Sequence, residues 1–301
     1  MCVSPFQRLI SFLVPVVVCV ASTFAHGSDP LPILGGAVAG SYPKAVLASQ
    51  PVGYWRLEET RGPVAADSSG HKENGQYRGG VTLQLPGAFA NDLSAGFDGK
   101  TGYVEVPGST AFSVPTSRKG LSVEVWFNPA ALKFRGESKD PYVYWLGKGE
   151  SAQQEWALRF YSQVSTRPNR ISAYVFSRSG GKGAGAFVEE PVHANEWIHI
   201  VACFDAGDKN SKGAGVSIYK DGVLRGSPAT QHGARYSSFD VVPHAGTAPL
   251  RFGTRNFTSY FDGGLDEVAI YPRVLTALEV QEHYRAARPL RTGLPRSDYT
   301  D

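Results

Sequence analysis

The chain has 301 residues, of which 42% are hydrophobic and 19% charged, the balance expected of a globular protein with a substantial core. The net charge is only +3 and no basic run is longer than Arg118–Lys119, so the charge pattern predicts no nucleic-acid partner. The chain contains 34 Gly, 20 Pro and a single Met, and 12% of its residues are aromatic. This composition favours strands and turns over a helical bundle.

The N-terminal residues have the pattern of an export signal. Arg8 precedes the apolar run 9–24, which is short for a membrane span. Small residues at Thr23 and Ala25 predict cleavage after Ala25 and a signal peptide over 1–25; an uncleaved anchor is the alternative. No later segment is long and apolar enough to span a bilayer. The mature chain is therefore expected to be secreted or located in the periplasm or cell envelope, without a transmembrane span.

Cysteine usage fits a single buried thiol. Cys2 and Cys19 lie within the predicted signal peptide, which leaves only Cys203 and no internal disulfide in the mature chain. Cys203 lies in the apolar run "WIHIVACF", so we interpret it as an inert core residue rather than a nucleophile.

One domain is expected between two irregular ends. Residues 26–44 are rich in Gly, Pro and Ala and predict a linker or loosely attached arm. Residues 288–301 are polar and interrupted by proline, as in a flexible tail. The domain itself is assigned to residues 45–287.

Within this domain, short segments rich in β-branched and aromatic residues alternate with turns. They read, in chain order, "YVEVP" from 103, "LSVEVWF" from 121, "YVYWLG" from 142, "WALRFYS" from 156, "RISAYVFS" from 170 and "EWIHIVACFD" from 196. Many short strands without alternating helices predict an all-β fold, an antiparallel two-sheet sandwich or jelly roll.

Two local signals complete the expected elements. Asp221-Gly222 in "VSIYKDGVL" predicts a two-residue hairpin turn. Thr276 and Glu279 have the spacing of a capping box, which predicts a short amphipathic helix over "ALEVQEHYRAA" after the strand closed by Pro272.

The stretch "FDGGLDEVAIYPRVL", residues 261–275, places two carboxylates in an apolar run. On a regular strand, Asp266 shares a face with Val268 and Ile270, whereas Glu267 points to the opposite face. The pair is therefore not expected to act as a catalytic dyad. Asp266 has the more apolar neighbours and needs an Arg, backbone N–H groups or a hard cation such as calcium as its partner.

A second acidic stretch, "ADSSGHKENGQYRGG" at residues 66–80, begins with Asp67. Its Asp-Ser-Ser-Gly sequence is typical of a plain turn. A turn that also holds calcium, through the Asp67 carboxylate and backbone carbonyls, is the alternative.

Several segments, in this order, resemble the LamG-like (laminin G-type) jelly-roll domains of the concanavalin A-like lectin/glucanase superfamily. They are "VGYWRLEE", "ADSSGHKENGQYRGGV", "AGFDGKTGYVEVP", "LSVEVWFNP", "EWIHIVACFD", "VSIYKDGVL" and "YFDGGLDEVAIYPRVLTALEVQEHYRAA". The resemblance covers about residues 52–287 and implies two curved antiparallel sheets. It also implies one structural calcium, for which Asp67 and Asp266 are the matching positions, with the backbone near Asn74 and Gly75 as a possible aid.

The same superfamily includes glycoside hydrolases, which need paired carboxylates. The glucanase pattern E-x-D-x-x-E is absent, and Glu124 in "SVEVWF" stands alone between Ser122 and Trp126 on its face. His199 alternates with Trp197 and is interpreted as a buried histidine with its hydrogen bonds satisfied. These observations favour a non-catalytic module, and a hydrolase or lyase is the alternative.

A binding module of this kind would recognise a carbohydrate or an extracellular or cell-surface protein. Sugars stack on exposed aromatic rings, and the strands and loops contain many candidates, of which at least half must be core residues. The residues expected to contact a ligand are Tyr144, Trp145, Trp156, Tyr174 and Tyr260, from a larger group that includes Tyr142, Tyr161 and Tyr236.

Overall fold

The computed structural model describes most of the predicted domain. The described residues are 42–114, 120–134, 141–150, 152–177, 183–205, 215–226 and 243–288. All of them belong to one compact unit, Ala37–Asp301. The predicted signal peptide, nearly all of the 26–44 arm, the tail beyond residue 288 and Tyr236 lie outside the described residues.

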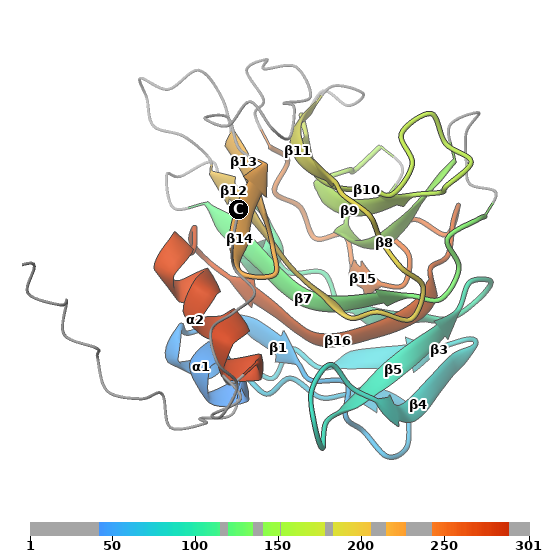
Figure 1. Cartoon of the computed structure of the whole chain (residues 1–301). Coiled ribbons are helices and arrows are strands. Elements are labelled where there is room, and N and C mark those ends of the chain that lie inside the picture. The colour runs from blue at the N-terminus through green and yellow to red at the C-terminus, as the bar shows by residue number, and fades with distance from the viewer. Residues whose placement is uncertain are drawn as a thin grey trace, which may run out of the picture. The chain divides into compact units, whose positions relative to one another are not determined.

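Two antiparallel sheets face each other (Figure 1). The first sheet has the order β14-β13-β12-β7-β16-β5-β4, and β1 also pairs with β16. Its strands are β1 (Gly53–Trp55), β4 (Val81–Pro86), β5 (Leu93–Asp98), β7 (Leu121–Pro129), β12 (Ile198–Asp205), β13 (Gly215–Lys220), β14 (Val223–Gly226) and β16 (Asp262–Tyr271). This arrangement confirms the predicted all-β sandwich.

The second sheet has the order β11-β10-β9-β8-β15-β6-β3-β2. Its strands are β2 (Val64–Ala65), β3 (Gly75–Arg78), β6 (Tyr103–Val106), β8 (Tyr142–Lys148), β9 (Trp156–Tyr161), β10 (Arg170–Phe176), β11 (Gly183–Glu189) and β15 (Leu250–Phe252). A short 3₁₀ helix, η1 (Thr110–Phe112), lies between β6 and β7 in the chain.

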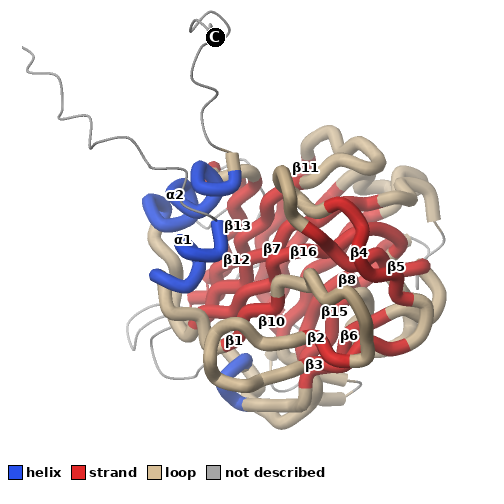
Figure 2. The backbone as a smooth tube through the Cα atoms, turned by 90° about the horizontal axis from the view of Figure 1, so that it is seen from below, coloured by secondary structure: helices blue, strands red, loops and turns tan. Residues whose placement is uncertain are grey.

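The main core lies between the sheets because the strands alternate. On β7, Val123, Val125 and Phe127 belong to this core, and Glu124 and Trp126 face the opposite side. Figure 2 shows the two sets of strands from a second direction. The first sheet thus has a separate outer face. The helices cover one part of this face, and a groove lies over another part.

Two helices cover one end of this outer face. The helices α1 (Tyr42–Ala48) and α2 (Ala277–Ala287) lie side by side in Figures 1 and 2. Tyr42 and Val46 of α1 are buried in a second hydrophobic cluster with Trp126 and Tyr271. The expected arm 26–44 therefore extends too far by three residues, since α1 is packed as part of the domain.

The two local predictions are confirmed. Thr276 Oγ1 accepts a hydrogen bond from the Glu279 backbone N–H at 3.2 Å, and a Glu279 carboxylate oxygen accepts one from the Thr276 N–H at 2.8 Å, which completes the capping box. Asp221 and Gly222 have φ angles of 52° and 78° between β13 and β14, as a type I′ turn requires.

Strand β16 departs from regular alternation at the acidic pair. Its register with β7 shifts between Asp266, which pairs with Trp126, and Ala269, which pairs with Glu124. Two residues of β16 thus oppose one residue of β7, and Glu267 has a φ of 53°. This β-bulge means that the expected separation of Asp266 and Glu267 onto opposite faces is wrong.

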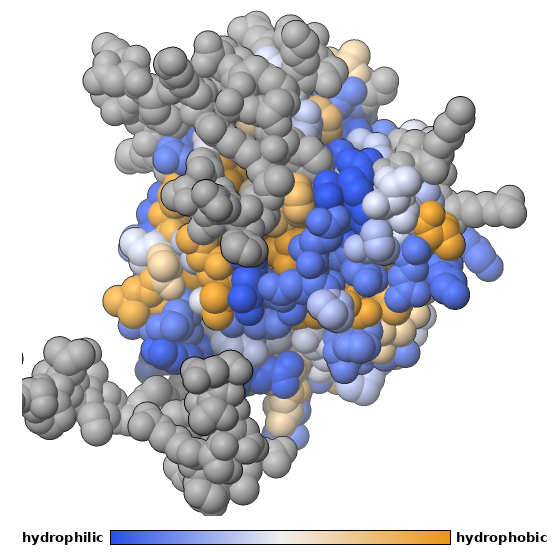
Figure 3. Space-filling view, turned by 45° about the horizontal axis from the view of Figure 1, so that its top comes forward, coloured by the Kyte–Doolittle hydropathy of each residue, from blue (hydrophilic) through white to orange (hydrophobic). Residues whose placement is uncertain are grey.

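The molecular surface is mixed. Figure 3 shows hydrophilic residues over much of one face, with hydrophobic residues gathered in smaller patches among them. Among the described residues, no helix is both long and apolar enough to cross a membrane.

Candidate functional site

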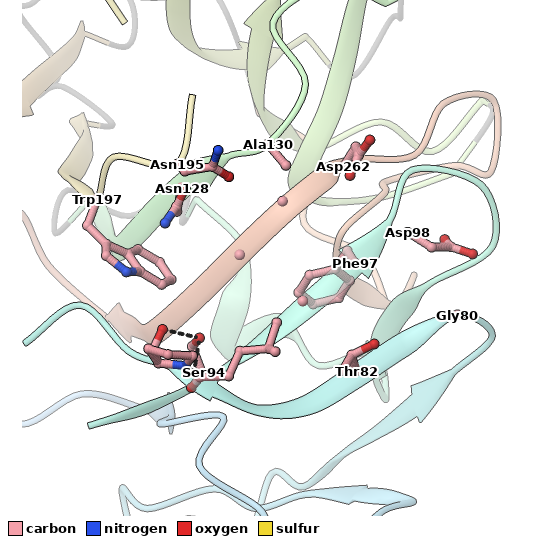
Figure 4. Close-up of a pocket in the computed structure, with 15 residues that line it drawn as sticks. Gly80, Thr82, Ser94, Phe97, Asp98, Asn128, Ala130, Asn195, Trp197 and Asp262 are labelled. Atoms are coloured by element: carbon pink, nitrogen blue, oxygen red, sulfur yellow. Dashed lines mark hydrogen bonds between the residues drawn. The ribbon is translucent and has the colours of Figure 1, made fainter. Parts of the chain in front are cut away.

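A groove of about 560 Å³ lies over β16, β5 and β7, beside the part of the first sheet that the helices cover. Figure 4 shows β16 along its floor, with Trp197 and Asn128 on one side and Phe97 and Thr82 on the other. Its lining comprises Gly80, Thr82, Leu85, Pro86, Ser94, Gly96, Phe97, Asp98, Asn128, Ala130, Asn195, Trp197, Asp262, Gly263 and Gly264.

Glycines on neighbouring strands keep the floor of the groove open. A Cβ atom on Gly264 would lie 2.9 Å from the Trp197 ring, and one on Gly96 would lie 2.5 Å from Leu85. Real carbon atoms do not approach so closely, so any side chain at these positions would displace the walls. The half-buried Trp197 ring lies against this floor and remains accessible from the groove.

Polar groups surround the indole. Asn128 is half-buried, and Asn195 and Asp262 are exposed. Amide and carboxylate groups of this kind can donate and accept hydrogen bonds with a polar ligand. The groove thus combines one aromatic surface with several polar groups, as binding sites for small polar molecules do.

Asp98 has a structural role at the end of the groove. Its carboxylate accepts hydrogen bonds from the backbone N–H groups of Lys100, Thr101 and Gly102 at 2.8–2.9 Å. Slight burial acts to raise its pKa, but these hydrogen bonds outweigh it and hold the pKa of Asp98 well below its usual value. Asp98 therefore remains an ionised acceptor and does not supply protons.

A second hollow of about 390 Å³ shares Asp98 and Asp262 with the groove. It is lined by exposed Lys100 and Lys133 and by half-buried Tyr260. Tyr260 thus lies in an accessible hollow next to the groove, which extends the concave surface beyond Trp197.

The other four predicted aromatic residues lie elsewhere. Trp145 and Trp156 are fully buried in the core, so the expectation that these two rings contact a ligand is wrong. The Trp156 indole N–H donates to the Phe112 carbonyl at 2.8 Å. A long apolar side chain in a central strand gives no local sign of which sheet face it occupies.

Tyr144 and Tyr174 lie on the outer face of the second sheet, away from the groove lining. Tyr144 is buried beneath the Arg255 guanidinium, 4.3 Å from its ring centroid. Tyr174 is half-buried, with Arg159 at 4.5 Å. Sequence reasoning did not single out Trp197, the tryptophan that lines the groove, although its position near Asn195, just before β12, was a usable signal.

Asp67 does not join Asp266 in one site. One Asp67 oxygen accepts hydrogen bonds from the Tyr54 and Ser69 backbone N–H groups, and the other accepts one from Glu73, each at 2.9 Å. Burial acts to raise its pKa, but hydrogen bonds from Ser69, Tyr54 and Glu73 outweigh it and lower the pKa. The plain-turn alternative thus accounts for these contacts, and Asp67 does not belong to the group of carboxylates around Asp266. Calcium binding by this loop stays a prediction.

Asp266 instead meets Asp92 and Glu267. These three side chains are buried, and one carboxylate oxygen of each lies within 4.8 Å of the other two. Asp92 comes from the loop between β4 and β5, and the bulge of β16 turns Glu267 toward the same side as Asp266. Sequence reasoning missed Asp92 because its partners are far away in the chain.

The cluster is electrostatically strained. Burial raises the pKa of Asp266 well above its usual value, and the charges of Asp92 and Glu267 add to the increase. Burial also raises the pKa of Glu267 to about 8, although the Tyr54 hydroxyl and the Arg56 guanidinium oppose the shift. Tyr54 donates a short hydrogen bond to Glu267, and Arg56 pairs with it at 3.2 Å.

A third polar cluster lies beneath the helices. Glu124 accepts hydrogen bonds from Tyr42 at 2.7 Å and from Tyr271 at 2.6 Å, and its two oxygens lie 2.7 Å from His199 and 2.8 Å from His283. All five residues are buried. The prediction that His199 is buried is confirmed, but its hydrogen bonds are only partly satisfied, because Nε2 contacts Glu124 while the buried Nδ1 has no partner among the described residues. Glu124 is inaccessible to a substrate.

Comparison with known proteins supports the fold. Residues 98–281 match the family described as the concanavalin A-like lectin/glucanases superfamily. Domain 4 of AbnA, a GH43 extracellular arabinanase from Geobacillus stearothermophilus solved in complex with arabinotriose, is 15% identical with a TM-score of 0.52. The similarity covers 78% of this chain and 98% of that domain.

Two domains described as binding domains are similar in fold. The botulinum neurotoxin type G receptor binding domain is 15% identical with a TM-score of 0.52 over 78% of this chain, and the binding domain of Paraclostridial Mosquitocidal Protein 1 is 14% identical with a TM-score of 0.55 over 80%. The chain spans about half of each, 51% and 53%. These likenesses show the fold, and no curated protein matches the chain in sequence.

Proposed function

Because the chain belongs to the concanavalin A-like lectin/glucanase superfamily, we propose that it is an exported, non-catalytic module that binds carbohydrate in the groove over β16. The observation that carries the proposal is the accessible Trp197 ring beside Asn128 and Asn195 on a glycine floor. The proposed export rests on the signal-like residues 1–25.

The chemistry of the groove suits a sugar. A pyranose or furanose ring presents C–H groups on one face, which pack against an indole ring, and hydroxyl groups around its edge. Asn128 and Asn195 can each donate to and accept from such hydroxyls, and Asp262 can accept. A site of about 560 Å³ lies within the usual size range of small-ligand pockets.

Structural neighbours support two kinds of partner. The arabinanase domain was solved with arabinotriose, which supports a glycan, whereas the neurotoxin domain is described as receptor-binding, which supports a protein. The groove favours the glycan because its glycine floor is recessed and flanked by polar groups. A protein partner, expected to bury a broader surface, is the alternative outcome of the binding test.

The groove carboxylates do not support catalysis. Acid–base hydrolysis of a glycosidic bond needs one carboxyl group with a raised pKa. Among the described groove residues, the carboxylates are Asp98, whose pKa is lowered, and the exposed Asp262. Among the described residues, the carboxyls with a raised pKa are Asp266 and Glu267, which are fully buried, and Glu58, which is half-buried and lies outside the groove lining.

The test is a glycan array followed by calorimetric titration of the best ligand. Trp197→Ala should weaken binding about 10- to 100-fold, since burial of a large apolar side chain contributes about 1.5–3 kcal/mol. Phe257→Ala is the matched control, because Phe257 is 43% exposed and lies outside the groove lining. Equal affinity for the two variants would refute the assignment of the groove.

Two further measurements separate the alternatives. Reducing-sugar release from the best ligand would establish an enzyme and refute the non-catalytic proposal. Cell fractionation with N-terminal sequencing tests export, and the expected mature N-terminus is His26. Intact chain confined to the cytoplasm would refute the export proposal.

A further inference from the structure

We infer that Arg255 and the aromatic side chains around it, on the outer face of the second sheet, form a binding site for the negatively charged group of an acidic polysaccharide. This group is a carboxylate or a sulfate, which a guanidinium recognises by the same paired hydrogen bonds. Arg255 does not belong to the lining of the groove over β16. The site is therefore a second one, and it stands whether or not the groove binds a glycan.

The site lies on β8, β9 and β10, three neighbouring strands of the second sheet (Figure 1). Alternation along each strand sends every second side chain into the core and the others to the outer face. The outward aromatic and basic side chains include Tyr142, Tyr144, Arg159, Tyr174 and Phe176. All of these except Tyr144 are only half-buried, so a ligand can reach the aromatic rings from solvent.

The Arg255 guanidinium lies over this face and is held in place by its neighbours. Its Cζ atom is 4.3 Å from the centroid of the Tyr144 ring and 5.3 Å from that of the Phe176 ring. Gly147 leaves room for this approach, because a Cβ atom there would lie 3.0 Å from Arg255 Cδ. The Arg255 carbonyl accepts a hydrogen bond from Arg251 at 2.9 Å. A guanidinium stacked in this way is already ordered before a ligand binds.

Arg255 has unused donors and no carboxylate partner among the described residues. Only 3% of its surface is exposed. Within the described part of the chain, Nη1 donates to the Gly149 carbonyl at 3.2 Å, and Nε has no hydrogen-bond partner. A guanidinium has five N–H donors and stays charged in a protein. Because a buried charge without an opposite charge is costly, an anion that binds here would stabilise the site.

Two other arginines of the same face show the contrast. Arg170 pairs with Glu189 at 2.7 Å, and Arg251 pairs with Glu105 at 2.8 Å. The protein supplies an opposite charge to each of these side chains. The described residues supply none to Arg255, whose charge is therefore left for a ligand.

The groups near Arg255 suit a sugar that carries the negative charge. The rings of Tyr174 and Phe176, with centroids 4.9 Å apart, offer apolar surface to the C–H groups of a sugar ring. The hydroxyls of Tyr142 and Tyr144 lie 3.4 Å apart and can exchange hydrogen bonds with sugar hydroxyls. A neutral sugar would use these rings and hydroxyls but would leave the charge of Arg255 unmatched.

Calorimetric titration of the full chain with defined oligosaccharides tests the site. The acidic probes are an oligogalacturonate and a sulfated cello-oligosaccharide. Their neutral counterparts are the methyl ester of the first and the unsulfated form of the second. The wild type should bind at least one acidic probe, and should bind its neutral counterpart at least about 10-fold more weakly. The acidic probe that binds more tightly identifies the group as a carboxylate or a sulfate.

Substitutions then locate the binding. Arg255→Gln should weaken binding of the acidic probe about 10- to 100-fold. Arg255→Lys keeps the positive charge but should also weaken binding, since an ammonium group cannot form the paired hydrogen bonds of a guanidinium. Arg225→Gln is the matched control and should leave the Kd unchanged, because the Arg225 side chain is 44% exposed on β14 of the first sheet. Circular dichroism confirms that each variant is folded.

Four results would overturn the assignment. The first is equal affinity of the wild type for an acidic probe and its neutral counterpart, a comparison that needs no variant. The second is the same Kd for Arg255→Gln and Arg225→Gln. The third is loss of acidic-probe binding in Trp197→Ala, which would move the binding to the groove. The fourth is tighter binding of poly-glutamate than of either acidic oligosaccharide, which would make the partner a protein.

Discussion

Tyr42→Phe tests whether α1 is an integral part of the domain. The Tyr42 hydroxyl donates to Glu124 at 2.7 Å, and its ring packs near Trp126 and Phe89, with centroid distances of 6.1 and 5.5 Å. The substitution removes one oxygen atom and retains these aromatic contacts. Any loss of stability therefore reports on the hydrogen bond to Glu124.

The expected loss is about 2 kcal/mol, because a hydrogen bond to a charged group contributes about 1.5–3 kcal/mol. Solvent cannot replace the lost donor, since Tyr42 and Glu124 are both buried. For a domain of this size, 1 kcal/mol changes the Tm by about 2–4 °C, so the Tm should fall by about 4–8 °C. Tyr271→Phe removes the hydrogen bond that the Tyr271 hydroxyl donates to the other Glu124 oxygen at 2.6 Å, and it should lower the Tm by a similar amount.

The assay is thermal unfolding followed by circular dichroism, with chemical unfolding to obtain the free energy. Tyr103→Phe is the control, because Tyr103 is half-buried and its hydroxyl makes no hydrogen bond within the described part of the chain. The Tyr42/Tyr271 double variant should depart from additivity, since both hydroxyls serve one carboxylate. If Tyr42→Phe unfolds at the same temperature as Tyr103→Phe, the reasoning is refuted.

Three other predictions concern pH, reactivity and the groove. Burial opposes a charged His283, but the Glu124 carboxylate outweighs this effect and raises the His283 pKa. The wild type should therefore have a higher free energy of unfolding than His283→Gln. This difference should be full below about pH 6.5 and should shrink as the pH rises through the pKa of His283 in the folded protein. The same advantage should fall on the acid side, as pH drops through the lowered pKa of Glu124; a pH-independent difference would contradict both statements. Burial raises the pKa of Cys203 to about 11, so iodoacetamide at pH 8 should modify it only after unfolding, as located by peptide mass spectrometry; rapid modification of native protein would contradict this. Gly264→Val should push the Trp197 ring aside and abolish glycan binding; unchanged affinity would exclude the floor from the site.

Local sequence patterns predicted the elements that depend on neighbouring residues. The capping box at Thr276 and Glu279 and the Asp221-Gly222 turn form within a few residues of chain, so their spacing was sufficient. Alternation likewise placed Glu124 on one face of β7 with Trp126. The helix α1 was missed because seven residues carry too little periodicity to reveal a helix that tertiary packing stabilises.

The acidic positions show where sequence reasoning stopped. Period-two alternation would separate Asp266 from Glu267, but one extra residue in the pairing of β16 with β7 turns both toward Asp92. A bulge of this kind depends on how two distant strands match, which no single strand encodes. The same limit applied to the aromatic residues, because burial of Trp145 and Trp156 and exposure of Trp197 depend on the sheet that packs against each.

The sequence by itself determined the all-β class, the superfamily, the closing helix and the burial of Cys203, since these follow from composition, short-range spacing and ordered motifs. Tertiary structure alone decided which carboxylates meet and which aromatic ring lines a groove. The physical reason is that a site is made by long-range register: Asp92 reaches Asp266, and Trp197 reaches Gly264, only after separate strands have paired.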